Sequence, residues 1–250
     1  MFELNNRTAL VTGAATGLGQ AISVALTRAG AKVAISDKPG ENLEETASLC
    51  ADCGHSSYLV DIDVRDLDQI RAGVTTVESE FGHIDILVNN AGINRPTPGL
   101  EVDQENWDDH FNTNIRGGFF CAQAVAPKMI EQKYGRVIFI SSQSGLIGIP
   151  GQPVYCSTKG GIINLVRTLG VEWAKHGITV NSVAPTFVET NLTRKRLQNP
   201  DFLNFVLGKI PKGELATPED VAHAVVYLAS DEAGMVNCTN LPVDGGWTAW

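Results

Sequence analysis

Two patterns of hydrophobic and polar positions alternate along this chain. Short, continuously apolar runs rich in β-branched residues predict strands that are covered on both faces. The longer stretches between them place apolar residues every three or four positions, which predicts helices. We expect strands at 8–13, 32–37, 57–64, 84–92, 136–142, 178–185 and about 241–244. We expect helices at 18–29, 42–50, 67–80, 107–131 (one or two helices), 155–175 and 218–230.

The regular alternation of strands and helices predicts an α/β fold with a doubly wound, Rossmann-type parallel sheet and helices on both faces. No linker divides the 250 residues, so we expect a single domain over 1–250. The segment 186–213 interrupts the alternation and predicts a substrate lid, although a pair of surface helices without a ligand role fits the same pattern. Its apolar residues suit a cover over a pocket: Phe187, Leu192, Phe202, Phe205 and Val206.

Charge and cysteine content narrow the class of protein. The formal net charge is −9, which argues against nucleic-acid binding because an acidic surface repels phosphates. The sequence lacks a signal-peptide pattern and an apolar run of about 20 residues, so we expect a cytoplasmic protein that does not enter membranes. The five cysteines are scattered, and Cys50 and Cys53 have no second pair with which to complete a zinc site, so no metal is expected.

A glycine-rich loop follows the first predicted strand and opens the first predicted helix. Glycines at this place allow a tight turn and a close approach of the backbone to a pyrophosphate, which the free N–H groups of the helix can bind. The loop predicts a dinucleotide site with these residues: Gly13, Thr16, Gly17, Leu18 and Gly19.

Two acidic residues indicate how the adenosine half of that dinucleotide would bind. Asp37 ends the second predicted strand about 20 residues after the loop, where a carboxylate accepts both ribose hydroxyls and repels a 2′-phosphate. Lys38 follows and attracts such a phosphate weakly, but the carboxylate favours NAD over NADP. Asp63 ends the third predicted strand, where it would meet the adenine edge while Val64 packs on the adenine face.

A second motif places a phenol beside an amine. Tyr155 and Lys159 are four residues apart in a predicted helix, so both side chains lie on one face. A nearby ammonium, together with the positive charge of an oxidised nicotinamide, would lower the pKa of the tyrosine from about 10 and make it a usable base. Ser142, at the end of the fifth predicted strand, would donate a hydrogen bond to the substrate oxygen.

Taken together, these motifs resemble the short-chain dehydrogenase/reductase family over nearly the whole chain. The matching pieces are Thr12-Gly13-(x3)-Gly17-x-Gly19, Asn89-Asn90-Ala91-Gly92, Asn114, Ser142 and Tyr155-(x3)-Lys159. The resemblance implies that Tyr155 is the general acid/base and that Ser142 orients the substrate. It implies that Lys159 binds the nicotinamide ribose and that Asn114 holds a water linking the lysine to solvent. Further cofactor contacts implied by the resemblance are Asn90, Ala91, Gly92, Ile140, Pro185, Val188 and Thr190.

One position departs from the family pattern. The family has Pro-Gly after the sixth strand, whereas this chain has Pro185-Thr186. A β-branched residue therefore stands where the family has glycine beside the nicotinamide. It either narrows that wall or donates its hydroxyl to the substrate.

The loops that should line the substrate pocket are rich in polar residues. Amides and hydroxyls favour a substrate with several hydroxyl groups. Arg95 would meet the carboxylate of a sugar acid, or else lie in solvent. The candidate substrate contacts are Asn94, Ser142, Ser144, Gln152, Tyr155 and Thr186. The stretch Asn94-Arg95-Pro96 and the C-terminal 244–250 also resemble the polyol and sugar-acid dehydrogenase branch of the family.

The sequence thus predicts an NAD-dependent oxidoreductase that interconverts a secondary alcohol and a ketone, and we expect it to oxidise a sugar alcohol to the keto sugar. Two enzyme alternatives remain open, a sugar-acid dehydrogenase of the gluconate type and a 3-oxoacyl-thioester reductase. A non-catalytic NAD-binding sensor is the alternative from another class, although it would not need an acid/base. The resemblance also implies a homotetramer, in which Trp247 and Trp250 of the apolar tail would be buried against a neighbour.

Overall fold

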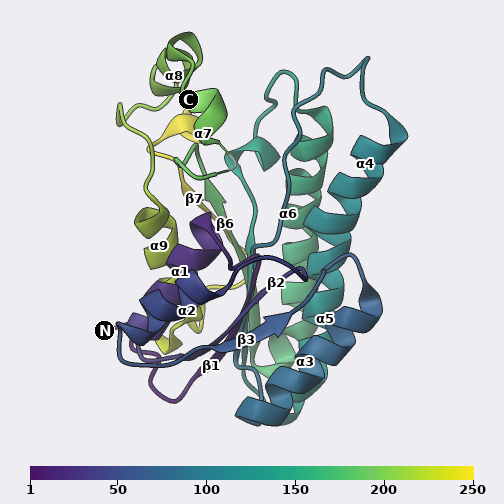
Figure 1. Cartoon of the computed structure of the whole chain (residues 1–250), viewed down its shortest axis with the longest axis vertical. Coiled ribbons are helices and arrows are strands. Elements are labelled where there is room, and N and C mark those ends of the chain that lie inside the picture. The colour runs from purple at the N-terminus through teal and green to yellow at the C-terminus, as the bar shows by residue number, and fades with distance from the viewer. Residues whose placement is uncertain (192) are drawn as a thin grey trace.

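The chain folds around one parallel sheet of seven strands (Figure 1), in a computed structural model that describes residues 1–191 and 193–250. The strand order is β3-β2-β1-β4-β5-β6-β7, so the chain first winds outward from β1 and then returns to β4 on the other side of it. Adjacent parallel strands end at the same edge of the sheet, and the return leaves a crevice there between β1 and β4. The strands are β1 (Thr8–Thr12), β2 (Lys32–Asp37), β3 (Tyr58–Asp61), β4 (Ile86–Asn89), β5 (Gly135–Ile140), β6 (Ile178–Pro185) and β7 (Asn240–Val243).

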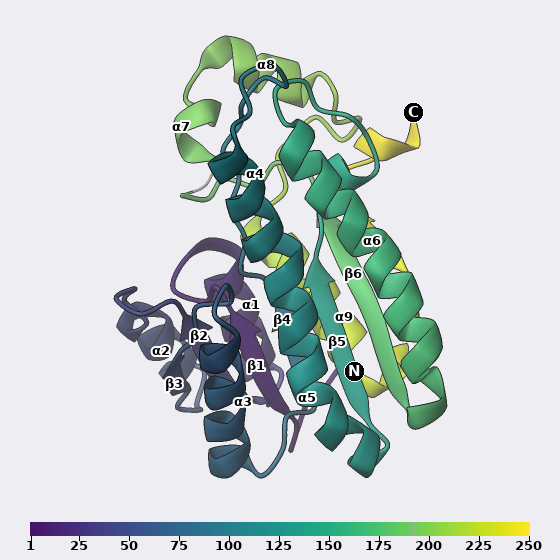
Figure 2. The same cartoon turned by 90° about the vertical axis from the view of Figure 1, so that its right-hand side faces the viewer.

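Helices cover both faces of the sheet, which confirms the predicted fold class. One apolar cluster joins α1 and α9 to the sheet, and a second joins α3, α5 and α6 to the opposite face; Figure 2 shows α5 and α6 in front of β5 and β6, with α9 behind. The helices are α1 (Gly17–Arg28), α2 (Glu44–Ala51), α3 (Leu67–Phe81), α4 (Gln104–Phe111), α5 (Gly118–Gln132), α6 (Pro153–Trp173) and α9 (Pro218–Ala229).

Local sequence signals explain where several helices begin. Thr217 and Asp220 form a reciprocal capping box at the start of α9, and Pro218 occupies the first helical position, where its missing N–H costs nothing. The side chain of Asp66 accepts hydrogen bonds from two backbone N–H groups at the start of α3. These caps satisfy donors that the helices themselves cannot pair.

The edge of the sheet departs from the sequence prediction. The predicted strands were expected to be buried on both faces, but β3 alternates between half-buried and exposed residues, with Leu59 36% exposed. The reason is its position, because β3 pairs only with β2 and has one open edge. It also ends at Asp61, so Asp63 lies two residues beyond it and not at its end as predicted.

The predicted helical stretch 107–131 is two helices, α4 and α5. They are joined by a π-helical turn, η1 (Asn112–Gly117), which the hydrophobic pattern does not reveal. Such turns insert one extra residue per turn and are common at functional sites. The turn carries Asn114, which is buried at 3% exposure.

The segment 186–213 contains two short helices, α7 (Arg194–Leu197) and α8 (Pro200–Leu207). Its aromatic side chains pack on the C-terminal tail, with Phe187 stacked on Trp247 at 5.8 Å between ring centroids. Trp247 is already buried within its own chain, at 6% exposure, whereas Trp250 is 81% exposed; burial of the tail against a neighbouring subunit stays a prediction. Leu192 lies outside the described residues, and the function of the segment as a substrate lid stays a prediction. In the part of the chain that is described, no helix is long and apolar enough to span a bilayer.

The difference in packing between the centre and the edge of the sheet can be tested by replacing one large side chain at each place with alanine. Phe139 on β5 is 1% exposed and packs so tightly under α5 that a Cβ at Gly118 would lie 2.9 Å from its ring. We expect Phe139→Ala to lower the free energy of unfolding by about 3–5 kcal/mol in urea titrations. The control Leu59→Ala, on the open edge, should cost less than about 1 kcal/mol. Equal losses in the two variants would contradict this account of the core.

Candidate active site

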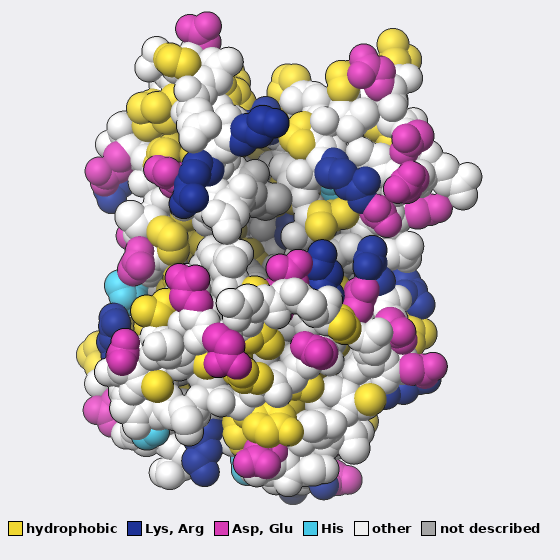
Figure 3. Space-filling model, in the orientation of Figure 1, with side chains coloured by type: hydrophobic (Ala, Val, Ile, Leu, Met, Phe, Trp, Pro, Cys, Tyr) yellow, Lys and Arg dark blue, Asp and Glu magenta, His cyan; other side chains and the backbone are white. Residues whose placement is uncertain are grey.

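A cavity of about 680 Å³ opens where β1, β2, β4, β5 and β6 end. Its walls come from segments far apart in the sequence, which only the parallel sheet brings together. In Figure 3 this face of the molecule is hollowed between the segment 186–213 and α4, and both basic and acidic side chains surround the hollow. The volume falls within the range of about 300–1,000 Å³ that is typical of ligand sites.

The glycine loop forms one end of this cavity. Gly13 (φ +65°) and Gly17 (φ +61°) adopt the left-handed conformation, and a Cβ at Gly13 would lie 2.7 Å from the Ala91 backbone. Thr16 occupies the N-cap position of α1, but its side chain makes no capping hydrogen bond in the described structure. The first N–H groups of α1 therefore remain available to an anion, and the positive end of the helix dipole favours one. A dinucleotide pyrophosphate fits this end of the cavity.

Asn90 fastens the loop to the sheet. Its side-chain amide donates to the carbonyls of Thr12 (3.0 Å) and Gly13 (2.8 Å), and so links the ends of β1 and β4. Gly19, expected among the cofactor contacts, faces this junction and is absent from the described cavity wall. A Cβ at Gly19 would lie 2.2 Å from the Gly13 carbonyl oxygen, so the glycine lets α1 pack closely against the loop.

The carboxylate of Asp37 stands at the adenosine end. One oxygen accepts from the backbone N–H of Ala15 at 3.1 Å, which holds the carboxylate against the glycine loop. Two cations also line this end, but each has an acidic partner: Lys38 pairs with Glu41 (3.2 Å) and Arg65 with Asp63 (2.7 Å). The charge that remains at the adenosine end is therefore negative.

Asp63 lines the cavity, but its carboxylate is already engaged. Both oxygens accept hydrogen bonds from the guanidinium of Arg65, and these bonds lower the pKa of Asp63. A contact with adenine would have to share that carboxylate or use another group of the residue. Arg65 is a cavity residue that the sequence analysis missed, although its position two residues after Asp63 was a usable signal.

The three proposed reaction residues lie together in the wall. Ser142 follows β5, and Tyr155 and Lys159 stand one turn apart on α6, whose first residue is Pro153. The Lys159 amine lies 5.5 Å from the centre of the Tyr155 ring and donates to the carbonyl of Ile140 at 2.8 Å. A Cβ at Gly92 would lie 3.7 Å from the same amine, so the loop after β4 also approaches it.

The electrostatics of this pair differ from the sequence prediction. Lys159 was expected to lower the pKa of Tyr155, but burial dominates and raises the pKa of Tyr155 to about 12, with a hydrogen bond to Ser142 opposing it. Burial also lowers the pKa of Lys159 to about 8. Both shifts have one cause, because burial penalises the charged form of each group. A tyrosine with this pKa needs a further positive charge beside it before it can act as a base near neutrality.

Asn114 is placed behind this group. Its amide donates to the Ile93 carbonyl (3.0 Å) and to the Thr158 hydroxyl (3.1 Å), and its oxygen accepts from the Ile93 N–H (2.8 Å). Asn114 is not among the described wall residues of the cavity. It ties the loop after β4 to α6 beside Lys159, and holding a water there stays a prediction.

The predicted substrate residues divide into two groups. Ser142, Tyr155 and Thr186 line the cavity, and Thr186 is 8% exposed. Asn94 and Gln152 bond to each other at 2.9 Å, and the backbone N–H of Ser144 bonds to the Ser142 hydroxyl at 3.1 Å. These three are absent from the described wall, so they shape the loops around the site.

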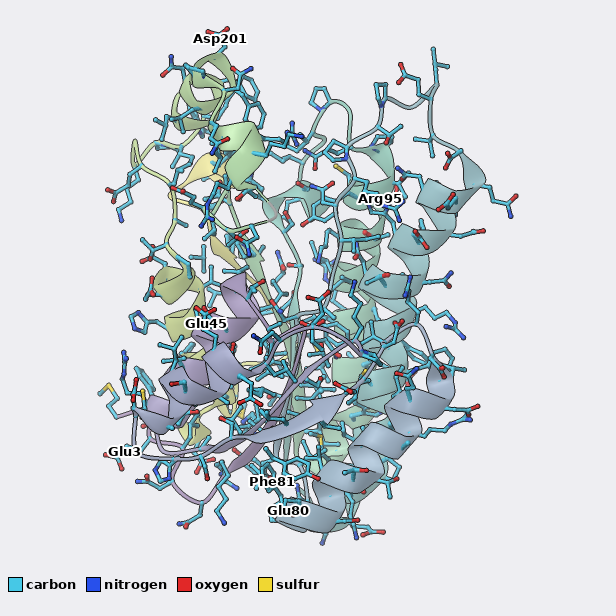
Figure 4. The ribbon with its side chains drawn as sticks, viewed as in Figure 1. Glu3, Glu45, Glu80, Phe81, Arg95 and Asp201 are labelled. Atoms are coloured by element: carbon cyan, nitrogen blue, oxygen red, sulfur yellow. The ribbon has the colours of Figure 1, made fainter. Side chains whose placement is uncertain are left out.

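Arg95 is in the wall but pairs with Asp109 of α4; Figure 4 shows it beside that helix, across the molecule from Asp201 on α8. Asp109, Thr113 and Thr193 are further wall residues that the sequence analysis missed. Nothing in their local sequence indicated that they line the cavity, because α4, η1 and the segment 186–213 reach it only through the folding of the chain. The remaining predicted cofactor contacts all lie in the wall: Thr16, Leu18, Val64, Ala91, Gly92, Ile140, Pro185, Val188 and Thr190.

Comparisons with known proteins identify the family to which this chain is similar. A family model described as enoyl-(acyl carrier protein) reductase matches residues 13–248. The chain is 38% identical to D-threitol dehydrogenase of Mycolicibacterium smegmatis, over 99% of this chain and 95% of that one. It is 38% identical to a 3-oxoacyl-(acyl-carrier-protein) reductase of Thermotoga maritima, over 98% of each chain. A crystal structure of gluconate 5-dehydrogenase from Burkholderia cenocepacia J2315, in complex with NADP and tartrate, superposes with a TM-score of 0.94 at 34% identity, covering 100% of this chain and 98% of that one.

The chain therefore belongs to the short-chain dehydrogenase/reductase family, as its motifs predicted. It is a nicotinamide-dependent oxidoreductase that acts on a CH–OH group, and its relatives include sugar-alcohol and sugar-acid dehydrogenases.

The pKa shift of Lys159 predicts how stability depends on pH. The unfolded chain keeps the lysine proton up to about pH 10, whereas the folded chain releases it near pH 8, so raising the pH between these values stabilises the folded state. From pH 7 to pH 10, the unfolding free energy of the wild type should gain about 2 kcal/mol relative to that of Lys159→Met. Urea titrations at each pH measure this difference. The same substitution at the exposed Lys195 should show no such trend, and a pH-independent difference for Lys159→Met would contradict the shift.

Proposed function

We propose that this enzyme is an NAD-dependent dehydrogenase that oxidises a secondary hydroxyl of a sugar alcohol to a ketone. The observation that supports this most strongly is the meeting of Ser142, Tyr155 and Lys159 in the wall of the cavity that also contains the glycine loop. A binding protein without catalysis would not need a half-buried phenol and a buried amine side by side, since both groups cost free energy to bury.

We assign the roles of the residues from the resemblance to the family, and their common place in the cavity wall supports this assignment. The Ser142 hydroxyl orients the substrate hydroxyl toward Tyr155, and Tyr155 as phenolate takes the hydroxyl proton. Lys159 holds the neighbouring ribose and stabilises the phenolate by its charge. A bound nicotinamide would supply the hydride acceptor that this oxidation needs, so that the same carbon becomes a ketone. In the reverse direction Tyr155 returns the proton to the carbonyl oxygen.

The preference for NAD rests on the charge at the adenosine end. Asp37 is held against the glycine loop, while Lys38 and Arg65 are paired with Glu41 and Asp63. A 2′-phosphate would meet a carboxylate, and the two cations of the described wall at this adenosine end already have acidic partners, so the repulsion is not offset. The related gluconate 5-dehydrogenase was solved with NADP, so the cofactor has to be decided for this chain by experiment.

A substrate with several hydroxyls is supported by the polar groups near the reaction residues. In the described wall, the buried hydroxyl of Thr186 has no hydrogen-bond partner among the residues described. Arg95 is paired with Asp109, so its charge is already engaged and is less available to a substrate carboxylate. This pairing favours a neutral polyol over a sugar acid. The net charge of −9 makes an acidic carrier protein a poor partner, which disfavours a 3-oxoacyl-thioester reductase. We further propose a cytoplasmic homotetramer, as the resemblance to the family implies.

A substrate panel tests this function. Incubation with NAD and sugar alcohols should form NADH, measured by its near-ultraviolet absorbance, more efficiently than incubation with sugar acids. Tyr155→Phe should lower kcat by about 10³-fold or more while calorimetry still detects NAD binding. The control is Tyr134→Phe. Tyr134 directly precedes β5, at the opposite end of that strand from Ser142, so this variant should keep full activity.

Three results would contradict parts of this proposal. Turnover of acyl thioesters with NADPH alone would assign the chain to the reductase alternative. A lack of turnover over the whole panel, with NAD bound, would favour the sensor. Substantial activity of Tyr155→Phe would remove the tyrosine from its role.

The cofactor preference has its own test. Asp37→Ser should raise kcat/KM for NADP relative to NAD by about 100-fold, because it removes a charge repulsion worth several kcal/mol. Asp61→Ser is the matched control. Asp61 stands opposite Asp37 in the register of β2 and β3, but it is exposed and outside the described wall. It should change the ratio by less than about two-fold because its charge is screened by solvent. A wild-type preference for NADP would overturn the assignment.

A further inference from the structure

Thr186 combines burial, an unsatisfied hydroxyl and a place in the cavity wall. It is 8% exposed, and its hydroxyl has no hydrogen-bond partner within the described chain. Its backbone N–H is satisfied, donating to the Val243 carbonyl at 3.0 Å, so the position of the residue is fixed by β7. The hydroxyl oxygen itself is buried beneath the wall surface, so a rotation of the side chain about its Cα–Cβ bond would bring it to a ligand in the cavity and supply the missing hydrogen bond.

The sheet places this hydroxyl close to the reaction residues. Thr186 directly follows β6, and Ser142 lies two residues after β5, which pairs with β6 in parallel register through Ile140 and Val183. Neighbouring strands lie about 4.8 Å apart, so a substrate oxygen held by Ser142 has its adjacent carbon within reach of Thr186. Gln143, next to Ser142, is also buried with an amide that has no partner in the described structure, but it lies outside the described wall.

We infer that the Thr186 hydroxyl binds the hydroxyl group on the carbon next to the one that is oxidised. This inference rests on the proposed function and sharpens it: the substrate is a vicinal diol, and the product is an α-hydroxyketone. A threonine hydroxyl both donates and accepts, so it matches a substrate hydroxyl in either direction of the bond. A substrate without that hydroxyl leaves the threonine unsatisfied, and sites of this kind discriminate strongly against such analogues.

The test compares two alcohols that differ only in the neighbouring hydroxyl. With NAD present, kcat/KM is measured for butane-2,3-diol and for butan-2-ol, and the ratio of the two values is the readout. The wild type should favour the diol by about 100-fold or more. Thr186→Val, which keeps the shape and removes the hydroxyl, should lower the ratio at least about 10-fold by slowing oxidation of the diol alone. Thr186→Ser, which keeps the hydroxyl, should retain most of the wild-type preference for the diol.

A matched control separates this role from a general effect of burial. Thr179 lies on the same strand, is 6% exposed and also has a hydroxyl without a partner in the described residues, but it stands at the opposite end of β6 and outside the described wall. Thr179→Val removes the same group and should leave the ratio unchanged. A fall in the ratio for both variants would contradict a specific contact.

The remaining outcomes distinguish the inference from the proposed function. An unchanged ratio in Thr186→Val, accompanied by a higher KM for NAD with both alcohols, would show that the hydroxyl serves the cofactor and would overturn the inference. Equal efficiencies of the wild type with both alcohols, or oxidation of sugar alcohols but not of butane-2,3-diol, would also overturn it while leaving the dehydrogenase intact. Absence of NADH formation with every alcohol in the panel would instead overturn the proposed function itself.

Discussion

The amine of Lys159 is the point at which the fold and the chemistry of this protein meet. Its hydrogen bond to the Ile140 carbonyl ties α6 to the end of β5, and so fixes Tyr155, one turn earlier, against the same strand end. Burial shifts the pKa of the amine to about 8 and that of the phenol to about 12, which favours the neutral form of each. In such surroundings of low dielectric, a single added charge is felt strongly. The pair is therefore suited to change protonation state when a charged ligand arrives.

The rest of the site depends on strand ends that meet at one edge of the sheet. Asn90 joins the ends of β1 and β4, and the closeness of that junction excludes a side chain at Gly13 or Gly19. The same junction directs the glycine loop and the start of α1 toward the cavity that Tyr155 faces from α6. A change in the glycine loop would thus move the phosphate site relative to the reaction residues.

Much of this could be predicted from the sequence, because the relevant signals are local. Strand and helix positions follow from hydrophobic periodicity, and the loop, Asp37 and the Tyr155–Lys159 pair are short motifs with a physical meaning. What could not be predicted depends on partners distant in the sequence. The pairing of Asn94 with Gln152, of Arg95 with Asp109, and the exposure of β3 all depend on which segments meet in the fold. The direction of the Tyr155 pKa shift was missed because burial, which outweighs the hydrogen bond with Ser142, is a property of the folded chain.

Unsatisfied polar groups need to be interpreted by location. A buried hydroxyl without a partner destabilises a fold by about 1–3 kcal/mol, and the structure has such groups both at Thr186 and at Thr179. At Thr179 nothing in the surrounding structure offers a compensating role. Thr186 lines the cavity, so a rotation of its side chain toward a bound ligand can supply the missing bond and recover the lost free energy. The glycine that the family has at this position would avoid the cost but could not discriminate between ligands, so the threonine trades some stability of the free protein for selectivity in the complex.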